Sequence, residues 1–332
     1  MTGACGMQEN EAACSTRQTR RKFLTLSFSA DTIGNMDNKS DKGASGNRWR
    51  RFLILAILFA LVVIVIKPFG CANRMFFWPD RGTYTGKDEM PFEVRDVYFK
   101  SEDGTKLHAW FCRAKGEKVK GAVFHLHGNA QNLTSHVRLV SWLPLKGYHV
   151  FAWDYRGYGK SEGSPTKSGL VKDTRAALEA FLNLPEIKDR NIPLIVFGQS
   201  LGAAYGGWIA SEHPDAFDAV ILDAPFTSHQ GIAIDALQRN PVTWILSWPL
   251  GWLLVSSGQD PVECVKKIRV PVLVIHGKAD HVIPHKMGVK VYKAANEPKE
   301  FLSHSGGHLF FDSETEKRRV HKGILDFLDK HF

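Results

Sequence analysis

The stretch LIVFGQSLGAAYGG, at residues 194–207, does most to decide the fold. Its first four residues are apolar, as in a buried strand, and its last residues are small, as in a closely packed helix. Between them, GQSLG at residues 198–202 matches the pattern G-x-S-x-G. Glycine suits both ends of this pattern because a strand that turns directly into a helix leaves little room for side chains. The stretch therefore predicts a tight turn that presents Ser200, a candidate nucleophile, in a strained conformation.

Strand-like and helix-like segments alternate along most of the chain. Residues 94–100 and 107–113 are alternating runs, and Asp103-Gly104 between them is a hairpin turn signal. Six short apolar runs follow, and helix-like stretches separate most of them. This order predicts an α/β fold with a mostly parallel, eight-stranded sheet and helices on both faces. The six runs are residues 121–127, 148–153, 193–197, 219–222, 270–276 and 300–303, and the helix-like stretches are residues 167–184, 200–213, 287–295 and 314–330.

The residues that would activate Ser200 should follow other strands, because ligand sites in such sheets lie beyond the carboxyl ends of the strands. A serine hydroxyl needs an imidazole to accept its proton and a carboxylate to orient that imidazole. His308 is the predicted base, since it follows the last strand after two glycines. Asp280 is the predicted acid, since it follows the preceding strand. Asp223, after the strand before that, is the alternative acid.

An acyl-transfer site also needs two backbone N–H groups that point at the developing oxyanion. Leu201, the residue after the candidate nucleophile, should supply one of them. The other should come from HLHGNA, residues 125–130, which follows an earlier strand. Asn129 is the preferred donor and Ala130 the second choice. The alternative is a simple glycine turn without a role in the chemistry.

From about residue 90 to residue 332, the chain resembles the α/β-hydrolase superfamily. It is most similar to the branch of serine aminopeptidases and monoacylglycerol lipases, which includes membrane-anchored α/β-hydrolase domain-containing proteins. The resemblance implies that Ser200, Asp280 and His308 form a catalytic triad, in the chain order of this superfamily. It also implies that residues 154–157 form a structural turn near the site. The motifs that carry the resemblance are HGNA at 127–130, DYRGYGKSEG at 154–163, GQSLG at 198–202, HGKAD at 276–280 and GGH at 306–308.

A lid-like insertion is expected at residues 227–265, where α/β-hydrolases often place a lid. The segment is apolar on nearly every side, and three prolines divide it into short helices. It is interpreted as an acyl-binding wall or a membrane-facing lip, with Trp244, Trp248 and Trp252 as candidate substrate-binding residues. The alternative is ordinary packing over the sheet edge.

Residues 52–66, FLILAILFALVVIVI, form an unbroken apolar run near the N-terminus. Its fifteen residues are fewer than the roughly 20 that span a bilayer. Trp49 and the basic residues at both ends can extend the run into the interface. We therefore expect a transmembrane signal anchor over residues 48–72 that contacts the membrane through residues 50–67. A cleaved signal peptide and a buried core helix are the alternatives.

The segments on either side of this run complete the predicted organisation. Basic residues are more numerous before the run than after it, so the positive-inside rule places the N-terminus in the cytoplasm. The catalytic domain, residues 73–332, would then lie outside the cytoplasm. Residues 1–47 are polar and lack periodicity, which predicts a disordered leader.

Composition argues against several other classes. The net charge of +9 is not gathered on one element with interleaved aromatic residues, so no nucleic-acid partner is expected. The five cysteines form no C-x-x-C pair and no cluster with histidines, so no metal site is expected. Cys112 and Cys264, the two in the predicted domain, could form a disulfide or remain buried thiols. The sequence does not indicate an oligomeric state.

These observations predict a serine hydrolase that cleaves carboxylic esters through an acyl-enzyme, without a metal or organic cofactor. Its partner would be a small-molecule or lipid ester. Peptide or amide hydrolysis and thioester cleavage are the alternatives, because all three reactions use the same residues. A catalytically silent, membrane-bound binding module is the alternative from another class.

Overall fold

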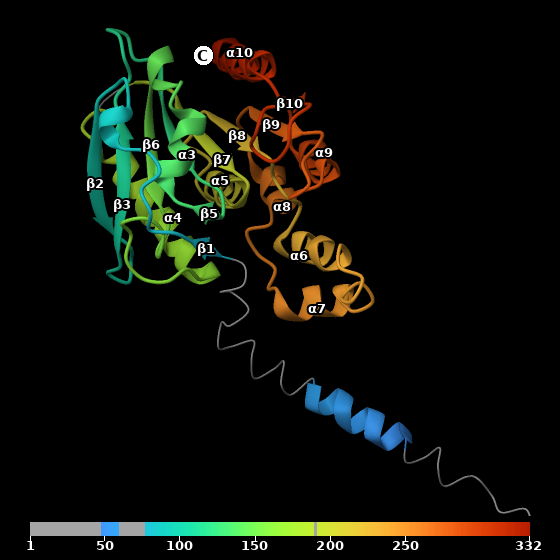
Figure 1. Cartoon of the computed structure of the whole chain (residues 1–332). Coiled ribbons are helices and arrows are strands. Elements are labelled where there is room, and N and C mark those ends of the chain that lie inside the picture. Colours follow the sequence, from blue (N-terminus) through green and yellow to red (C-terminus); the bar gives the residue numbers. More distant parts are fainter. Residues whose placement is uncertain (1–47, 60–76, 189–190) are drawn as a thin grey trace, which may run out of the picture. The chain divides into compact units, whose positions relative to one another are not determined.

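The computed structural model describes residues 48–59, 77–188 and 191–332, apart from the side chains of Leu253 and Leu254. The chain divides into two compact units, Met1–Ile54 and Leu55–Phe332. Residues 48–59 form a helix (Figure 1), and the side chains of this helix are exposed. The predicted leader, residues 1–47, and the end of the predicted anchor, residues 60–72, lie outside the described residues. No helix within the described ranges is long and apolar enough to cross a membrane.

The second unit is built around an eight-stranded sheet. Its strands are β2 (Val94–Lys100), β3 (Lys106–Cys112), β4 (Gly121–Leu126), β6 (Tyr148–Asp154), β7 (Leu194–Gln199), β8 (Ala219–Asp223), β9 (Val272–Gly277) and β10 (Lys299–His304). Their order is β10-β9-β8-β7-β4-β6-β3-β2. β3 pairs antiparallel with β2 and β6, and every other pair in this sheet is parallel. The predicted mostly parallel sheet with an antiparallel start is confirmed.

Helices cover both faces of this sheet (Figure 1). Successive residues of a strand point to opposite faces, so a strand buried on both sides is apolar throughout. The helices are α3 (Leu133–Val140), α4 (Lys167–Leu182), α5 (Leu201–Glu212), α6 (His229–Gln238), α7 (Ser247–Leu254), α8 (Pro261–Cys264), α9 (His285–Ala294) and α10 (Glu314–His331). In β4, Phe124 packs in the core that includes residues of α4 and α5, whereas Val123 packs in the core that includes residues of α3 and α10.

The structure adds elements that the sequence analysis did not predict. α3 spans only eight residues, too few for its apolar spacing to stand out, and the Asn132 side chain caps it by accepting from Thr134 N–H. A second, two-stranded sheet pairs β1 (Trp78–Pro79) with β5 (Ala130–Gln131). Single 3₁₀ turns occupy Lys87–Glu89, Pro144–Lys146 and Val265–Lys267. The predicted insertion contains the helices α6, α7 and α8.

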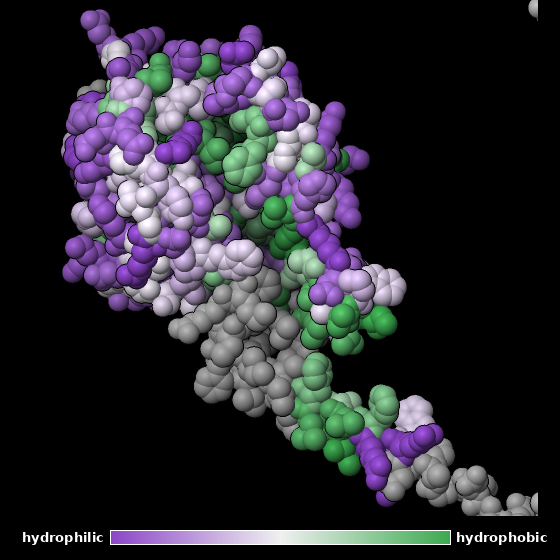
Figure 2. Space-filling model, viewed as in Figure 1, coloured by the Kyte–Doolittle hydropathy of each residue, from purple (hydrophilic) through white to green (hydrophobic). Residues whose placement is uncertain are grey.

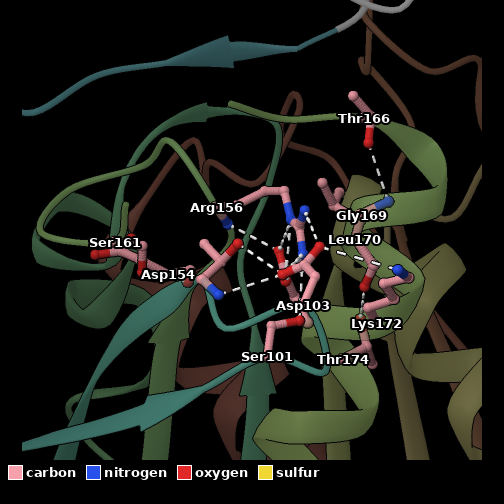
Figure 3. A network of polar contacts seen from close by, with 12 residues as sticks. Ser101, Asp103, Asp154, Arg156, Ser161, Thr166, Gly169, Leu170, Lys172 and Thr174 are labelled. Carbon is pink, nitrogen blue, oxygen red and sulfur yellow. Dashed lines mark hydrogen bonds and ion pairs between the residues drawn. The ribbon is translucent and has the colours of Figure 1, made fainter. Parts of the chain in front are cut away.

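The turn after β6 is organised around Arg156 (Figure 3). Its guanidinium donates to Asp173 in α4 at 2.7 Å and to Asp103 in the β2–β3 hairpin at 2.9 Å. Gly169 makes room for this side chain, since a Cβ there would lie 2.6 Å from Cδ of Arg156. The network joins the hairpin, the turn and α4, which agrees with the predicted structural role of residues 154–157.

Candidate active site

The candidate site lies where the path of the chain across the sheet reverses. From β4 the chain moves to β6 on one side, and it returns to β7 on the other side of β4. β4 and β7 are paired, with Leu126 opposite Gly198. The loops that follow these two strands therefore meet at a topological switch point, which is where open α/β sheets bind ligands.

Ser200 occupies the tight turn between β7 and α5, with φ of 56° and ψ of −112°. Such a conformation costs a residue other than glycine on the order of 1–3 kcal/mol. The flanking glycines allow the turn, because a Cβ on Gly202 would lie 2.0 Å from the carbonyl oxygen of Leu126. On Gly198, a Cβ would lie 2.3 Å from the carbonyl oxygen of Gly202. The turn places Ser200 at the N-terminus of α5, where the helix dipole favours negative charge.

Ser200, His308 and Asp280 come together from the loops after β7, β10 and β9. Ser200 Oγ lies 3.1 Å from His308 Nε2, and His308 Nδ1 lies 2.8 Å from Asp280 Oδ2. An ionised carboxylate only accepts hydrogen bonds, so Nδ1 carries the hydrogen and Nε2 is left to accept from the Ser200 hydroxyl. This is the geometry that general-base activation of a serine requires.

Asp280 accepts hydrogen bonds from two backbone N–H groups besides His308, and a second histidine, His276, lies close to it. Its Oδ1 accepts from the backbone N–H groups of Val282 and Ile283, each at 2.8 Å. His276 Nε2 lies 3.4 Å from its Oδ2. Burial raises the pKa of Asp280, but hydrogen bonds from His276 and His308 outweigh burial and hold that pKa well below its usual range. Asp280 is therefore charged, and its charge can stabilise an imidazolium at His308.

Asp223, the alternative acid, has a different partner. In the described part of the chain its Oδ2 accepts from Gln199 Nε2 at 3.2 Å rather than from His308. Gln199 Oε1 in turn lies 2.9 Å from His125 Nε2. Burial raises the pKa of Asp223 to about 6, although Gln199 and His308 act in the opposite direction. The carboxylate that contacts His308 is thus the one predicted first.

The segments that carry the predicted oxyanion donors lie close together, since a Cβ on Gly202 in α5 would lie 2.7 Å from the carbonyl oxygen of His127 after β4. Leu201 opens α5, and N–H groups in the first turn of a helix have no acceptor within the helix. Asn129 lies in the loop after β4, where its carbonyl oxygen and Oδ1 are 2.8 and 3.0 Å from the hydroxyl of Tyr158. Ala130, the second choice, pairs with Trp78 in the small sheet. These contacts anchor the loop next to the first turn of α5.

Backbone strain gathers at this edge of the sheet. Five residues other than glycine have positive φ in the described ranges. Three of them follow strands that end at the site, Ser200 (56°), Ala224 (50°) and Leu309 (58°), and Gln131 (64°) ends β5. Residues held in this region cluster at functional sites because the surrounding structure must over-determine them.

The three candidate tryptophans of the insertion lie on or just before α7. Trp244, Trp248 and Trp252 are 60%, 67% and 68% exposed, whereas ordinary packing over the sheet edge would bury them. Residues 241–259 contain no ionisable side chain. Apolar residues gather over α7 on the face shown in Figure 2. The segment is therefore an exposed, uncharged apolar surface.

Several site features were missed from the sequence. His276 was noted only as part of HGKAD, although a histidine four residues before the acid, on the same strand end, could have signalled a contact. His304, like His276, is buried, and it lies at the end of β10. Cys112 and Cys264 are both buried free thiols. Within the described ranges, no group of three or more His, Cys, Asp or Glu residues could hold a metal ion.

Comparison with known proteins identifies the family. The family model "Serine aminopeptidase, S33" matches residues 117–266. The alpha/beta hydrolase domain-containing protein WAV2 of Arabidopsis thaliana is 31% identical over 71% of this chain and 79% of its own length. The chain belongs to the α/β-hydrolase superfamily. Another relative is the lysophosphatidylserine lipase ABHD12 of Danio rerio, which is 29% identical over 87% of this chain and 83% of its own length.

A solved structure supports the same fold. The Pyrococcus furiosus esterase PF2001 superposes with a TM-score of 0.61 at 20% sequence identity, over 77% of this chain and 98% of that one. At this identity the likeness concerns the fold of the α/β-hydrolase alone. The chain therefore belongs to a hydrolase family, and the superposition agrees with the α/β-hydrolase fold.

Proposed function

We propose that the protein is a serine hydrolase that cleaves carboxylic esters through a covalent acyl-enzyme. The observation that carries this proposal is the chain of hydrogen bonds from Ser200 through His308 to Asp280, with Ser200 held at a strained turn. A hydroxyl next to a neutral imidazole, which a buried carboxylate orients, is the arrangement that makes serine nucleophilic.

The reaction proceeds in two balanced halves. Ser200 Oγ bonds to the ester carbonyl carbon while its proton moves to His308 Nε2, and the Asp280 carboxylate stabilises the resulting imidazolium. The N–H groups of Leu201 and Asn129 stabilise the oxyanion. His308 then returns the proton to the departing alkoxide, which leaves as an alcohol. In the second half, water bonds to the acyl carbon while His308 takes its proton. The bond between the acyl carbon and Ser200 Oγ then breaks, His308 returns the proton to Oγ, and a carboxylic acid leaves.

Lipid esters are the substrate class that we favour. Three exposed tryptophans and an uncharged segment of the insertion provide apolar surface for an acyl chain or for a lipid headgroup region. The lipase named among the relatives supports this choice. We further propose that the apolar run at residues 52–66 anchors the chain in a membrane, with the N-terminus in the cytoplasm and the hydrolase domain outside.

Peptide hydrolysis is the second candidate, because the matching family model describes serine aminopeptidases. Thioesters are chemically equivalent at the acylation step. The test is hydrolysis by the full chain of nitrophenyl esters from acetyl to palmitoyl, with aminoacyl anilides and acyl thioesters in parallel. Ser200→Ala serves as the control. We expect ester turnover that disappears in Ser200→Ala, whereas Ser200-dependent turnover of anilides alone would replace the proposal with peptidase activity.

A further inference from the structure

His276 lies next to Asp280, the acid of the candidate triad. It lies near the carboxyl end of β9, fully buried, and its Nε2 lies 2.9 Å from the carbonyl oxygen of Ile283. A carbonyl oxygen only accepts, so Nε2 carries the hydrogen. The same atom is 3.4 Å from Oδ2 of Asp280, the oxygen that also contacts His308. Nε2 thus bonds to the carbonyl at one end of the 280–283 turn and lies close to the carboxylate at the other end.

The other edge of the His276 ring makes no comparable contact. In the part of the chain that the structure describes, its buried Nδ1 has no hydrogen-bond partner. This edge rests on α9 at Gly288, where a Cβ would lie only 2.2 Å from Nδ1. Burying an unpaired nitrogen is unfavourable, and an apolar side chain of similar size would avoid it. Packing alone therefore does not explain a histidine at this position.

We propose that His276 is a positioning residue for the acid of the triad. Its Nε2–H holds the Ile283 carbonyl and Oδ2 of Asp280 together, and this fixes the turn so that Oδ2 faces His308. The Val282 and Ile283 N–H groups donate only to Oδ1 of Asp280. Without His276, the other carboxylate oxygen, Oδ2, would therefore keep His308 as its one side-chain donor among the described residues. The inference deepens the proposed function and rests on it.

Two amide substitutions separate positioning from packing. In His276→Gln the amide nitrogen can occupy the place of Nε2, whereas in His276→Asn the shorter side chain places its amide near Nδ1 or Cδ2. We expect His276→Gln to keep kcat close to that of the wild type. His276→Asn and His276→Leu should lower kcat on the order of 10–100-fold with little change in KM, since misplaced catalytic groups cost about this much.

His285→Gln is the matched control. This histidine lies beside His276 with ring centroids 5.6 Å apart, but its Nε2 is 3.0 Å from Ser303 Oγ and not directed at Asp280. It should retain kcat. All variants are assayed as full chains, with kcat expressed per serine titrated by a fluorophosphonate and with thermal unfolding measured alongside, so that unfolded molecules do not count.

The outcomes distinguish this inference from the proposed function. If the wild type and Ser200→Ala turn over esters equally, the proposed function fails. If Ser200→Ala is inactive but His276→Asn matches His276→Gln in kcat, only the positioning role fails. Unfolding of both His276→Asn and His276→Leu would also overturn positioning in favour of a purely structural role.

Discussion

At the scale of single residues, two buried carboxylates lie at or just after the ends of neighbouring strands and differ in their surroundings. Asp280 accepts from two backbone N–H groups and contacts two histidines, and these donors keep it charged despite burial. Asp223 accepts from the neutral amide of Gln199, and burial raises its pKa to about 6. The two positions therefore lead to opposite expectations for the same Asp→Asn change.

Asp280→Asn should abolish most of the activity, whereas Asp223→Asn should not. An amide at position 280 cannot stabilise an imidazolium and favours the wrong tautomer of His308, which costs about 10⁴-fold in kcat at comparable sites. At position 223 an Asn oxygen can still accept from Gln199, so kcat should stay within an order of magnitude. Steady-state ester hydrolysis by both variants checks this. Equal losses of kcat would mean that Asp223 shares the orienting role.

Asp223→Asn should also change the pH dependence of stability. Because the folded pKa of about 6 lies above the reference value of 3.8, the folded state holds the proton more tightly than the unfolded chain. The wild type therefore loses stability as pH rises through this window, up to ~3 kcal/mol. The variant should unfold at higher temperature than the wild type at about pH 8 and match it near pH 3. A constant difference at both pH values would contradict the raised pKa.

At the scale of elements, two glycines of α5 differ in how closely other parts of the chain approach them. The backbone of β4 lies against Gly202, whereas Gly207 has only an ordinary side-chain contact. A Cβ on Gly202 would lie 2.0 Å from the Leu126 carbonyl oxygen, which belongs to the neighbouring strand. Gly207, one turn further along α5, would bring its Cβ to 3.8 Å from the Leu222 side chain, an ordinary contact.

Gly202→Ala and Gly207→Ala should therefore have opposite effects on the free energy of unfolding. The first forces β4 and α5 apart and should cost several kcal/mol together with the activity. The second replaces glycine inside a helix and should stabilise the fold by about 1 kcal/mol with activity retained. Denaturant unfolding of both variants is the measurement. Tolerance of alanine at position 202 would argue against the tight turn.

The sequence predicted the strands within about two residues because each is a short apolar run that ends in turn residues. That Ser200, Asp280 and His308 lie close together could be predicted because each of them follows the end of a strand. α3 and the β1–β5 pair could not, since two to eight residues carry too little periodicity. The contact of His276 with Asp280 depends on how the 280–283 turn folds back, and sequence spacing alone does not determine this.

At the scale of the whole molecule, the proposed anchor at residues 52–66 should attach the chain to a membrane, and the hydrolase domain should carry the catalysis. The full chain should remain in the membrane fraction after an alkaline carbonate wash. Ile57→Arg combined with Leu58→Arg should release it, because each arginine at the centre of a spanning helix costs roughly 2.5–3.5 kcal/mol. Alanine at the same two positions is the control. Wild-type chain in the soluble fraction would contradict the proposed anchor.

The central claim is that Ser200 is the nucleophile, and its covalent adduct is the most direct test. The full chain is incubated with a fluorophosphonate and then digested. Mass spectrometry measures the mass of the peptide that contains residues 198–202. We predict a phosphonate on Ser200, slow labelling in His308→Gln and none in Ser200→Ala. An unmodified peptide in folded, ester-hydrolysing protein, or equal labelling after Ser200→Ala, would contradict the account.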